Sequence, residues 1–462
     1  MGLARLDLSH NQLSSLQPGS LAAAPALSSL NLAHNRLTVL DRTVFSSLPR
    51  LAELQLAHNS LAALPPDLFL HNPGLQRLDL SNNSLATVHL SVLRNLTDLV
   101  SLNLSSNLLD ENWVKEDLLS DLTSLERLDL SHNHLASLEP GLLQHSARLA
   151  WLDLSHNRLV VLASQALSAL PSLHHLSLAH NQLESVAQSA LARPAPALHS
   201  LQLQANRLQS LPTELFRNMS NLSRLSLARN QLTQLPRSLA DLSSLTHLDL
   251  SVNIVGVLGP AHLHRLANLT FLNLSSNDIS RVDAATFNET PGLHWLDLSN
   301  NRLLSLEQSS FSALRNLTHL NLAGNQLSDI NGLLTPTQRL QYLNLSSNRL
   351  DWFDYAFVHN TLKVLDIHDN LIDSVQNYYS VREGYQLEYL DASRNQISAL
   401  GVLSLLPSLR TILLNHNKIS DIGHNTFLNK DNLTHVDLRA NRISVLNLPA
   451  LAVSETLKNG KH

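Results

Sequence analysis

The sequence predicts an α/β solenoid, a stack of short coils with one β-strand each, and three observations support this. A segment of the form Leu-x-x-Leu-x-Leu-x-x-Asn-x-Leu returns about every 24 residues along a chain of 462 residues. Leucine contributes 111 residues, whereas aromatic residues make up 4% and charged residues 15% of the chain. Cysteine is absent, so neither disulfides nor Cys-bound zinc can hold the chain together. This composition excludes an ordinary enzyme domain.

The asparagine of each segment marks one coil, and the spacing lies in the range of leucine-rich repeats. We expect a horseshoe with a parallel β-sheet on its concave face and irregular or short helical segments on its convex face. Nineteen coils form a single predicted array over residues 1–448, irregular at 107–133 and 351–395, and residues 449–462 form a tail. The marking asparagines are Asn11, Asn35, Asn59, Asn83, Asn107, Asn133, Asn157, Asn181, Asn206, Asn230, Asn253, Asn277, Asn301, Asn325, Asn348, Asn370, Asn395, Asn417 and Asn441.

Each position of the coil has a predicted structural role. In Leu-x-Leu the alternation of a short strand points both leucines inward and the residue between them, often Asp, toward solvent. The asparagine follows where the strand ends, and its amide can both donate to and accept from backbone groups that would otherwise be buried without partners. Ten residues later a large apolar residue recurs, which predicts a buried spine. Its members are Phe45, Phe69, Phe216, Phe287, Phe311 and Phe427, with Leu21, Leu143, Leu167 and Leu191 in other coils.

Two stretches break the rhythm of the repeat and differ in composition. Residues 107–133 form a longer, acidic coil that contains Trp113. Residues 351–390 hold eight of the 19 aromatic residues, and aromatic side chains are enriched at protein interfaces. The competing interpretation is that these aromatics fill a distorted coil. The interface interpretation gives as partner-binding candidates Trp352, Tyr355, Tyr378, Tyr379 and Tyr385.

Eleven Asn-x-Ser/Thr sequons predict an extracellular glycoprotein, although the repeat itself favours Asn-Leu-Ser and Asn-Leu-Thr. A glycan on Asn103, Asn273 or Asn344 would cover part of the concave sheet, because these residues occupy the outward strand position. The candidate glycosylation sites are Asn82, Asn95, Asn103, Asn218, Asn221, Asn268, Asn273, Asn288, Asn316, Asn344 and Asn432.

Seven of the 24 histidines directly precede a marking asparagine: His10, His34, His58, His132, His156, His180 and His416. Stacked imidazoles at this position would give a pH-sensitive face. The chain contains no His-Glu-x-x-His, phosphate loop, dinucleotide fingerprint or Gly-x-Ser-x-Gly motif. We therefore expect no enzyme activity, no cofactor and no metal site.

The charge balance also limits the partners. The formal net charge is −5, so no polycation is available for nucleic acid or an acidic membrane surface. Neither a signal peptide nor an 18-residue apolar run is visible, so we expect no membrane contact by this chain. A long concave surface suits a macromolecule better than a small ligand, which indicates an extracellular protein partner and permits homo- or hetero-association.

The last repeats are similar to the ectodomain of arthropod Toll receptors, especially the long Tollo-like branch. The similarity lies mainly in residues 350–448, in the segments 361–370 (TLKVLDIHDN), 377–380 (NYYS), 386–395 (QLEYLDASRN) and 432–443 (NLTHVDLRANRI). This resemblance implies a type I membrane receptor with disulfide-capped repeats, a transmembrane helix and a cytoplasmic TIR domain. It also implies a ligand of the Spätzle cystine-knot type or a surface receptor, in immunity or development.

The chain shows no cap cysteines, membrane span or TIR domain, so we expect a fragment of a receptor located at the cell surface. The leading hypothesis is a non-enzymatic, protein-binding portion of a Toll-like receptor. The alternative is a secreted or membrane-anchored leucine-rich adhesion protein of chaoptin-like character, without TIR signalling. An intracellular scaffold is a third hypothesis, which glycan occupancy would exclude.

Overall fold

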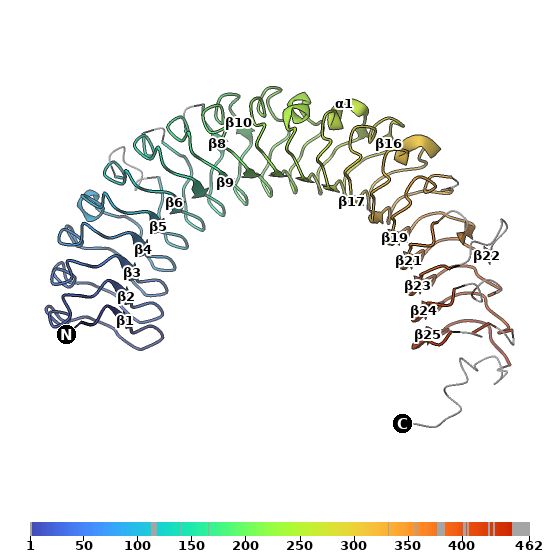
Figure 1. Ribbon diagram of the computed structural model, residues 1–462, viewed down its shortest axis with the longest axis horizontal. Helices are drawn as coiled ribbons and strands as arrows, with labels where there is room; N and C mark the ends of the chain where they lie inside the picture. The colour runs from blue at the N-terminus through green and yellow to red at the C-terminus, as the bar shows by residue number, and fades with distance from the viewer. Residues whose placement is uncertain are drawn as a thin grey trace. The chain divides into compact units, whose positions relative to one another are not determined.

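The computed structural model describes residues 2–445 except 112–117, 140, 165, 331, 356–357, 377–383, 401–402, 404–405, 424–425 and 428–429. The chain divides into two compact units, one of residues 1–232 with 236–244 and one of residues 233–235 with 245–462. Each unit is a solenoid of short coils (Figure 1), as the repeat predicts. The single array of residues 1–448 stays a prediction.

The first unit contributes ten three-residue strands to a parallel sheet. Neighbouring strands pair residue for residue at the same position of the repeat, so that Leu6 lies opposite Leu30 and Leu30 opposite Leu54. The leucine at the centre of each strand therefore always meets another leucine. The strands are β1 (Arg5–Asp7), β2 (Ser29–Asn31), β3 (Glu53–Gln55), β4 (Arg77–Asp79), β5 (Ser101–Asn103), β6 (Arg127–Asp129), β7 (Trp151–Asp153), β9 (His175–Ser177), β11 (Ser200–Gln202) and β12 (Arg224–Ser226).

The second unit repeats this arrangement with nine strands. Its register is continuous from Leu248 opposite Leu272 to Ile412 opposite Val436, although the coils between residues 325 and 417 vary in length. The strands are β13 (His247–Asp249), β15 (Phe271–Asn273), β17 (Trp295–Asp297), β18 (His319–Asn321), β19 (Tyr342–Asn344), β21 (Val364–Asp366), β23 (Tyr389–Asp391), β24 (Thr411–Leu413) and β25 (His435–Asp437).

The side of the coils opposite these sheets has little regular structure, which confirms the predicted irregular and short helical segments. Among the described residues it carries one α-helix, α1 (Pro260–Leu263), and three 3-10 turns, η1 (Leu90–Val92), η2 (Arg237–Asp241) and η3 (Gln308–Phe311). Three two-stranded parallel sheets also form there, which the sequence did not predict. They pair β8 (Val161–Leu162) with β10 (Ser185–Val186), β14 (Val257–Leu258) with β16 (Arg281–Val282), and β20 (Phe353–Asp354) with β22 (Val375–Gln376).

The marking asparagines bind adjacent coils to each other, as predicted. Asn181 is 8% exposed, and its Nδ2 donates to the carbonyl of Leu154 in the preceding coil at 2.9 Å and to that of Leu178 in its own coil at 3.1 Å. Its Oδ1 accepts from the Leu159 N–H of the preceding coil at 3.0 Å. The same pattern recurs along both units, for example at Asn35 and Asn277. One buried amide per coil thus pairs backbone groups of two coils.

The predicted apolar spine is confirmed. Each of its phenylalanines is at most 1% exposed, and Phe45 stacks on Phe69 with ring centroids 6.0 Å apart. The leucines in the same position are also buried, at 7% exposure or less. Because leucines from the strands fill the rest of each coil, the core of each unit is a continuous apolar column.

The aromatic segment of residues 351–390 contributes to the core rather than to a surface at two of its candidate positions. Tyr355 is 1% and Tyr385 3% exposed, and the Tyr385 hydroxyl donates to the Tyr355 carbonyl at 3.2 Å. Phe353 packs edge-on against Tyr355, with centroids 5.5 Å apart. The partner-binding prediction is therefore wrong for Tyr355 and Tyr385, because both rings fill the interior of their coils. Trp352 is half-buried and stays a candidate, while Tyr378 and Tyr379 lie outside the described residues.

Candidate partner-binding surface

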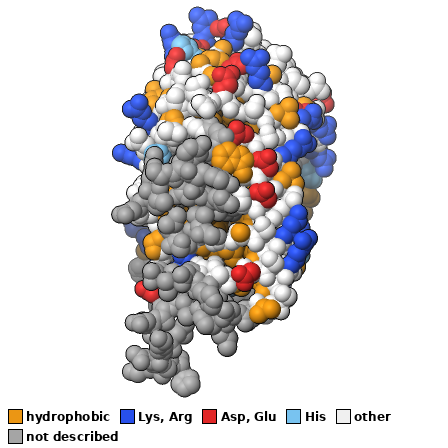
Figure 2. Space-filling view, turned by 90° about the vertical axis from the view of Figure 1, so that its right-hand side faces the viewer, with side chains coloured by type: hydrophobic (Ala, Val, Ile, Leu, Met, Phe, Trp, Pro, Cys, Tyr) orange, Lys and Arg blue, Asp and Glu red, His pale blue; other side chains and the backbone are white. Residues whose placement is uncertain are grey.

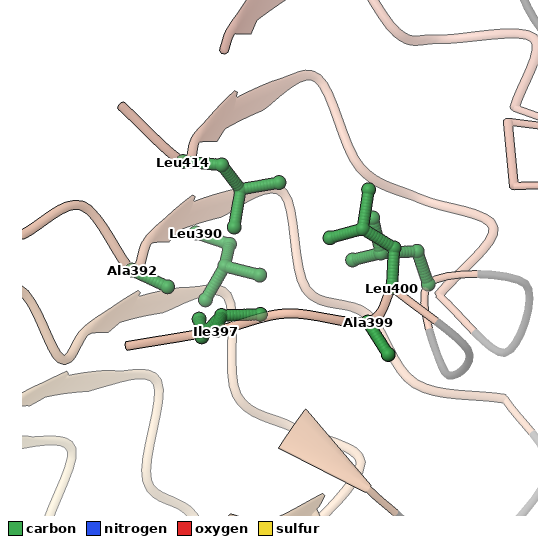
Figure 3. A pocket seen from close by; sticks show the side chains of 7 residues that line it. Leu390, Ala392, Ile397, Ala399, Leu400 and Leu414 are labelled. Atoms are coloured by element: carbon green, nitrogen blue, oxygen red, sulfur yellow. The ribbon is translucent and has the colours of Figure 1, made fainter. Parts of the chain in front are cut away.

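A cavity lies in the interior of the coils beneath β23 and β24, but it is too small for a ligand. That cavity (Figure 3) has a volume of about 10 Å³ and is lined by Leu390, Ala392, Ile397, Ala399, Leu400, Leu403 and Leu414. This is space for one water molecule at most, and the lining offers no polar partner. The side chains on the outer face of the strands are therefore the stronger candidates for a binding role.

The outer face of the strands in the second unit carries a row of aromatic rings, which we call the aromatic row. Each ring comes from the residue directly before the buried central leucine of its strand, so strand alternation points it away from the core. Phe271 and Trp295 stack almost in parallel, with centroids 4.3 Å apart and planes 9° apart. The row consists of His247, Phe271, Trp295, His319 and Tyr342.

The aromatic row contains two stacks with a break between them. His247, Phe271 and Trp295 form the first stack, and His319 and Tyr342, 5.8 Å apart, form the second. In the described part of the chain no ring or cation contacts the side of Trp295 that faces His319. The His319 ring instead lies near Thr318, whose Oγ1 is 3.0 Å from Nδ1. The side of the Trp295 ring toward His319, its paired neighbour in β18, thus carries no stacked ring or cation among the described residues, and we call it the uncovered side.

A second row of carboxyl and amide groups runs beside the aromatic row, two residues further along each strand. This acid–amide row contains Asp249, Asn273, Asp297, Asn321 and Asn344. Asp297 is only 9% exposed, which differs from the predicted outward Asp, because the Asn321 Nδ2 donates to its Oδ2 at 3.0 Å and the Ser299 N–H donates to its Oδ1 at 2.8 Å. Neither donor is charged, so the negative charge of Asp297 has no cationic partner among the described residues.

The first unit shows the same chemistry with a cation in place. There the Trp151 ring lies between the Arg127 guanidinium, 4.5 Å from the ring centroid, and the His175 imidazole at 5.5 Å. Asp129 and Asp153 lie two residues further along the same strands and oppose each other. Burial, with repulsion from Asp153 and Asp79, raises the pKa of Asp129. Arg127 thus covers a tryptophan beside two carboxylates within the chain.

The predicted histidine stacks are present in the first unit. His10, His34 and His58 stack at 4.1 Å per step, and His132, His156 and His180 at 4.0 and 4.2 Å. Each adopts a left-handed conformation, with φ from 53° to 55°. Loss of hydration, followed by repulsion from the neighbouring imidazoles, lowers the pKa of His34 and of His156. These columns are exposed edges of the strand face rather than metal-binding groups.

One group of described residues has the composition of a cation ligand set, although the sequence predicted none. Asp366, His368 and Asp391 place their ligand atoms within 4.8 Å of one another, and all three are half-buried. The His368 Nδ1 lies 2.7 Å from Asp366 Oδ1. Burial and the nearby Asp391 raise the pKa of Asp366, while the bonds from His368 lower it.

The surface of the second unit seen in Figure 2 has acidic and basic side chains interspersed, without a continuous basic patch among its described residues. Surface ion pairs such as Arg302–Asp278 at 2.7 Å and Arg281–Asp283 at 2.8 Å lie away from the aromatic row. In the described residues, no helix is long and apolar enough to cross a bilayer.

The sequons fall into three structural environments. Asn103, Asn273 and Asn344 lie half-buried on the strand face, and each Oδ1 accepts the N–H of the sequon serine. Asn82, in the turn after β4, and Asn316 are also half-buried, and the Nδ2 of Asn316 donates to a carbonyl. Exposed side chains belong to Asn95, Asn218, Asn221, Asn268, Asn288 and Asn432, although the Nδ2 of Asn221 donates to the Pro196 carbonyl at 2.7 Å.

The aromatic row was missed in the sequence because its members are 23 or 24 residues apart. A solenoid brings together residues at one position of successive coils, so neighbours on its surface do not cluster along the chain. Aligning the residue before the central leucine would have shown Phe271, Trp295, His319 and Tyr342 in one column. The same alignment places Arg127 beside Trp151.

These features define the class of the protein. A sequence model described as leucine rich repeat matches residues 2–61, 49–109, 123–183, 147–193, 196–255, 251–303, 291–350 and 360–419, so the chain belongs to the leucine-rich repeat family.

Among individual proteins, the chain is similar to Toll-like receptor 7 of Drosophila melanogaster, with 44% identity over 128 residues. That match covers 28% of this chain and 9% of the receptor, and it confirms the predicted resemblance to Toll receptors. The fold matches Toll in the Drosophila Toll–Spatzle complex, with a TM-score of 0.77, 20% identity, and coverage of 97% of this chain and 73% of that one. It also matches a leucine-rich repeat protein of Leptospira interrogans, with a TM-score of 0.67, 23% identity, and coverage of 93% and 94%.

Proposed function

We propose that the chain is a protein-binding portion of a Toll-like receptor ectodomain that acts by association and not by chemistry. The aromatic row carries this proposal. Large rings that remain half-exposed on a strand face are unusual outside binding surfaces, because aromatic residues are enriched in the cores of protein interfaces. The 44% identity to Toll-like receptor 7 supports a receptor rather than an adhesion protein.

The partner that we propose is an extracellular protein, either a Spätzle-like cystine-knot ligand or a surface receptor. Exposed sequons such as Asn268, Asn288 and Asn432 support an extracellular or cell-surface location for the full-length protein. Binding through the strand face leaves the opposite side, with Asn95, Asn218 and Asn288, free to carry glycans. The proposed binding face and these exposed sequons are thus compatible.

The test is binding of the secreted chain to purified Spätzle-type cystine-knot proteins and to candidate surface receptors, measured by biolayer interferometry. Replacing Phe271 and Tyr342 with Ser, the residue that Ser29, Ser101 and Ser200 supply at this position, should weaken binding about tenfold or more. Val257→Ser is the matched control, because Val257 is 51% exposed on the opposite side of the same unit. Unchanged binding in the double variant, or equal loss in the control, contradicts the strand face as the binding surface. Aggregation of beads coated with the chain, measured without any ligand, would favour the alternative that the chain is part of an adhesion protein.

A further inference from the structure

The uncovered side of the Trp295 ring identifies the chemistry of the partner group. Its other side is already covered by Phe271 at 4.3 Å. Beside it, the carboxylate of Asp297 receives hydrogen bonds only from neutral donors, the Ser299 N–H and the Asn321 amide. An aromatic face next to a carboxylate without a counter-ion attracts a planar cation, which can stack on the ring and bond to the carboxylate together.

The first unit contains an internal example of the filled arrangement. Trp151 is covered on both sides, by the Arg127 guanidinium at 4.5 Å and by the His175 ring at 5.5 Å, with Asp153 on its own strand. Trp295 and Asp297 occupy the same two positions of their strand as Trp151 and Asp153 do in β7. The difference is that Phe271 takes the place of Arg127 on the β15 side of Trp295, while His319, the counterpart of His175 on the β18 side, is not stacked on the Trp295 ring.

The chain itself does not supply the missing cation. The aromatic and acid–amide rows from β13 to β19 contain no Lys or Arg, and the flanking positions before and after each strand are also neutral at pH 7. The flanking residues are Thr246, Thr270, His294, Thr318 and Gln341 before the strands, and Ser251, Ser275, Ser299, Ala323 and Ser346 after them. This part of the strand face is therefore aromatic with a net negative charge.

We propose that Trp295, His319 and Asp297 form a slot for an arginine side chain of the protein partner. The guanidinium would stack on the Trp295 face that points toward His319 and donate to the Asp297 carboxylate, as Arg127 covers Trp151 within the chain. This inference rests on the proposed function and adds the kind of surface that the partner presents. Lysine fits less well, because an ammonium group cannot stack and bond in a bidentate manner.

The slot also requires that Asn273 carries no glycan. Asn273 lies between Asp249 and Asp297 in the acid–amide row, beside Phe271. A glycan attached to its Nδ2 would cover the Trp295 ring. The half-buried position of Asn273, in contrast to the exposed Asn268 three residues before Phe271, agrees with an unmodified side chain.

The test uses the full chain from secreting insect cells and a labelled peptide with three arginines separated by glycines, measured by fluorescence anisotropy. A peptide with lysine in place of arginine tests the effect of the charge alone. A peptide with citrulline in place of arginine tests the effect of the planar shape alone. The arginine peptide should bind about tenfold more tightly than either. Equal binding of the lysine peptide overturns the slot.

Variants localise the effect. Trp295→Ser should reduce affinity for the arginine peptide about tenfold, whereas Trp151→Ser, whose ring already contacts Arg127, should leave it unchanged. His319→Arg should fill the slot from within the chain and abolish binding. Equal losses for Trp295→Ser and Trp151→Ser, or a glycan on Asn273 detected by glycopeptide mass spectrometry, overturn the inference. Because the peptide assay does not use the protein ligand, it can fail while the ligand still binds at the strand face, and the two proposals are tested separately.

Discussion

The asparagine that joins two coils gives a prediction with a magnitude that follows from its contacts. In Asn181→Ala, the carbonyls of Leu154 and Leu178 keep other donors, since Asn157 also donates to Leu154 at 3.1 Å and Asn206 to Leu178 at 2.9 Å. The Leu159 N–H, by contrast, donates to Asn181 Oδ1 and loses this acceptor in the variant.

A buried donor without an acceptor costs about 1–3 kcal/mol, and the shared bonds that are lost contribute about 1 kcal/mol more. We therefore expect a loss of about 3 kcal/mol in the local free energy of opening. At 1.4 kcal/mol per factor of ten, this corresponds to an approximately 100-fold faster exchange of the Leu159 amide.

Hydrogen–deuterium exchange with peptide-level mass spectrometry measures this change, and urea unfolding gives the global value. Asn11→Ala is the matched control, because Asn11 is exposed and bonds only to carbonyls of its own coil, Leu8 at 3.0 Å and Ser9 at 3.1 Å. The control should cost about 0.5 kcal/mol or less. Exchange at Leu159 that stays at the wild-type rate, or equal costs at Asn181 and Asn11, would refute the reasoning.

Three further predictions concern the core and the titratable groups. Phe287→Ala, at a fully buried spine position, should cost about 3–5 kcal/mol in urea unfolding, whereas the exposed Val257→Ala should cost little; a loss below about 1 kcal/mol contradicts the spine. Because the folded pKa of His34 and His156 is lowered, the unfolded chain binds more protons near pH 6.5, so Tm should fall between pH 7 and 5. Asn82 shows that asparagine is compatible with this left-handed turn, so both histidines can be replaced with Asn. The double variant should reduce the dependence of Tm on pH in a thermal-shift series. An unchanged dependence counts against the histidine stacks. Burial lowers the pKa of Lys430 to about 8, so the free energy of unfolding should rise from pH 8 to 10.5, and Lys430→Met should remove that rise in urea titrations.

The sequence predicted the features that repeat in every coil. Leucine alternation set the strands, and the asparagine and phenylalanine positions set the buried ladder and spine, because each of these residues meets its own counterpart one coil away. The resemblance to Toll receptors agrees with the similarity to a Toll-like receptor.

What the sequence did not show depends on contacts between different coils or on local filling. Tyr355 and Tyr385 are expected at the surface from the sequence, yet both rings pack into the interior of their coils. The partial burial of Asp297 comes from Asn321 one coil further on. These depend on side-chain packing between coils, which a periodic pattern leaves open.

The constant register of the strands has a consequence for how such a chain can change in length. Because every coil presents the same leucines and the same asparagine to both neighbours, duplication or deletion of one whole coil joins surfaces that already fit. Loss of a single residue inside a strand would instead turn the central leucine to the outside. Variation between related receptors should therefore occur as whole-coil steps or as changes in the segments between strands, with the outward strand residues free to acquire new partners.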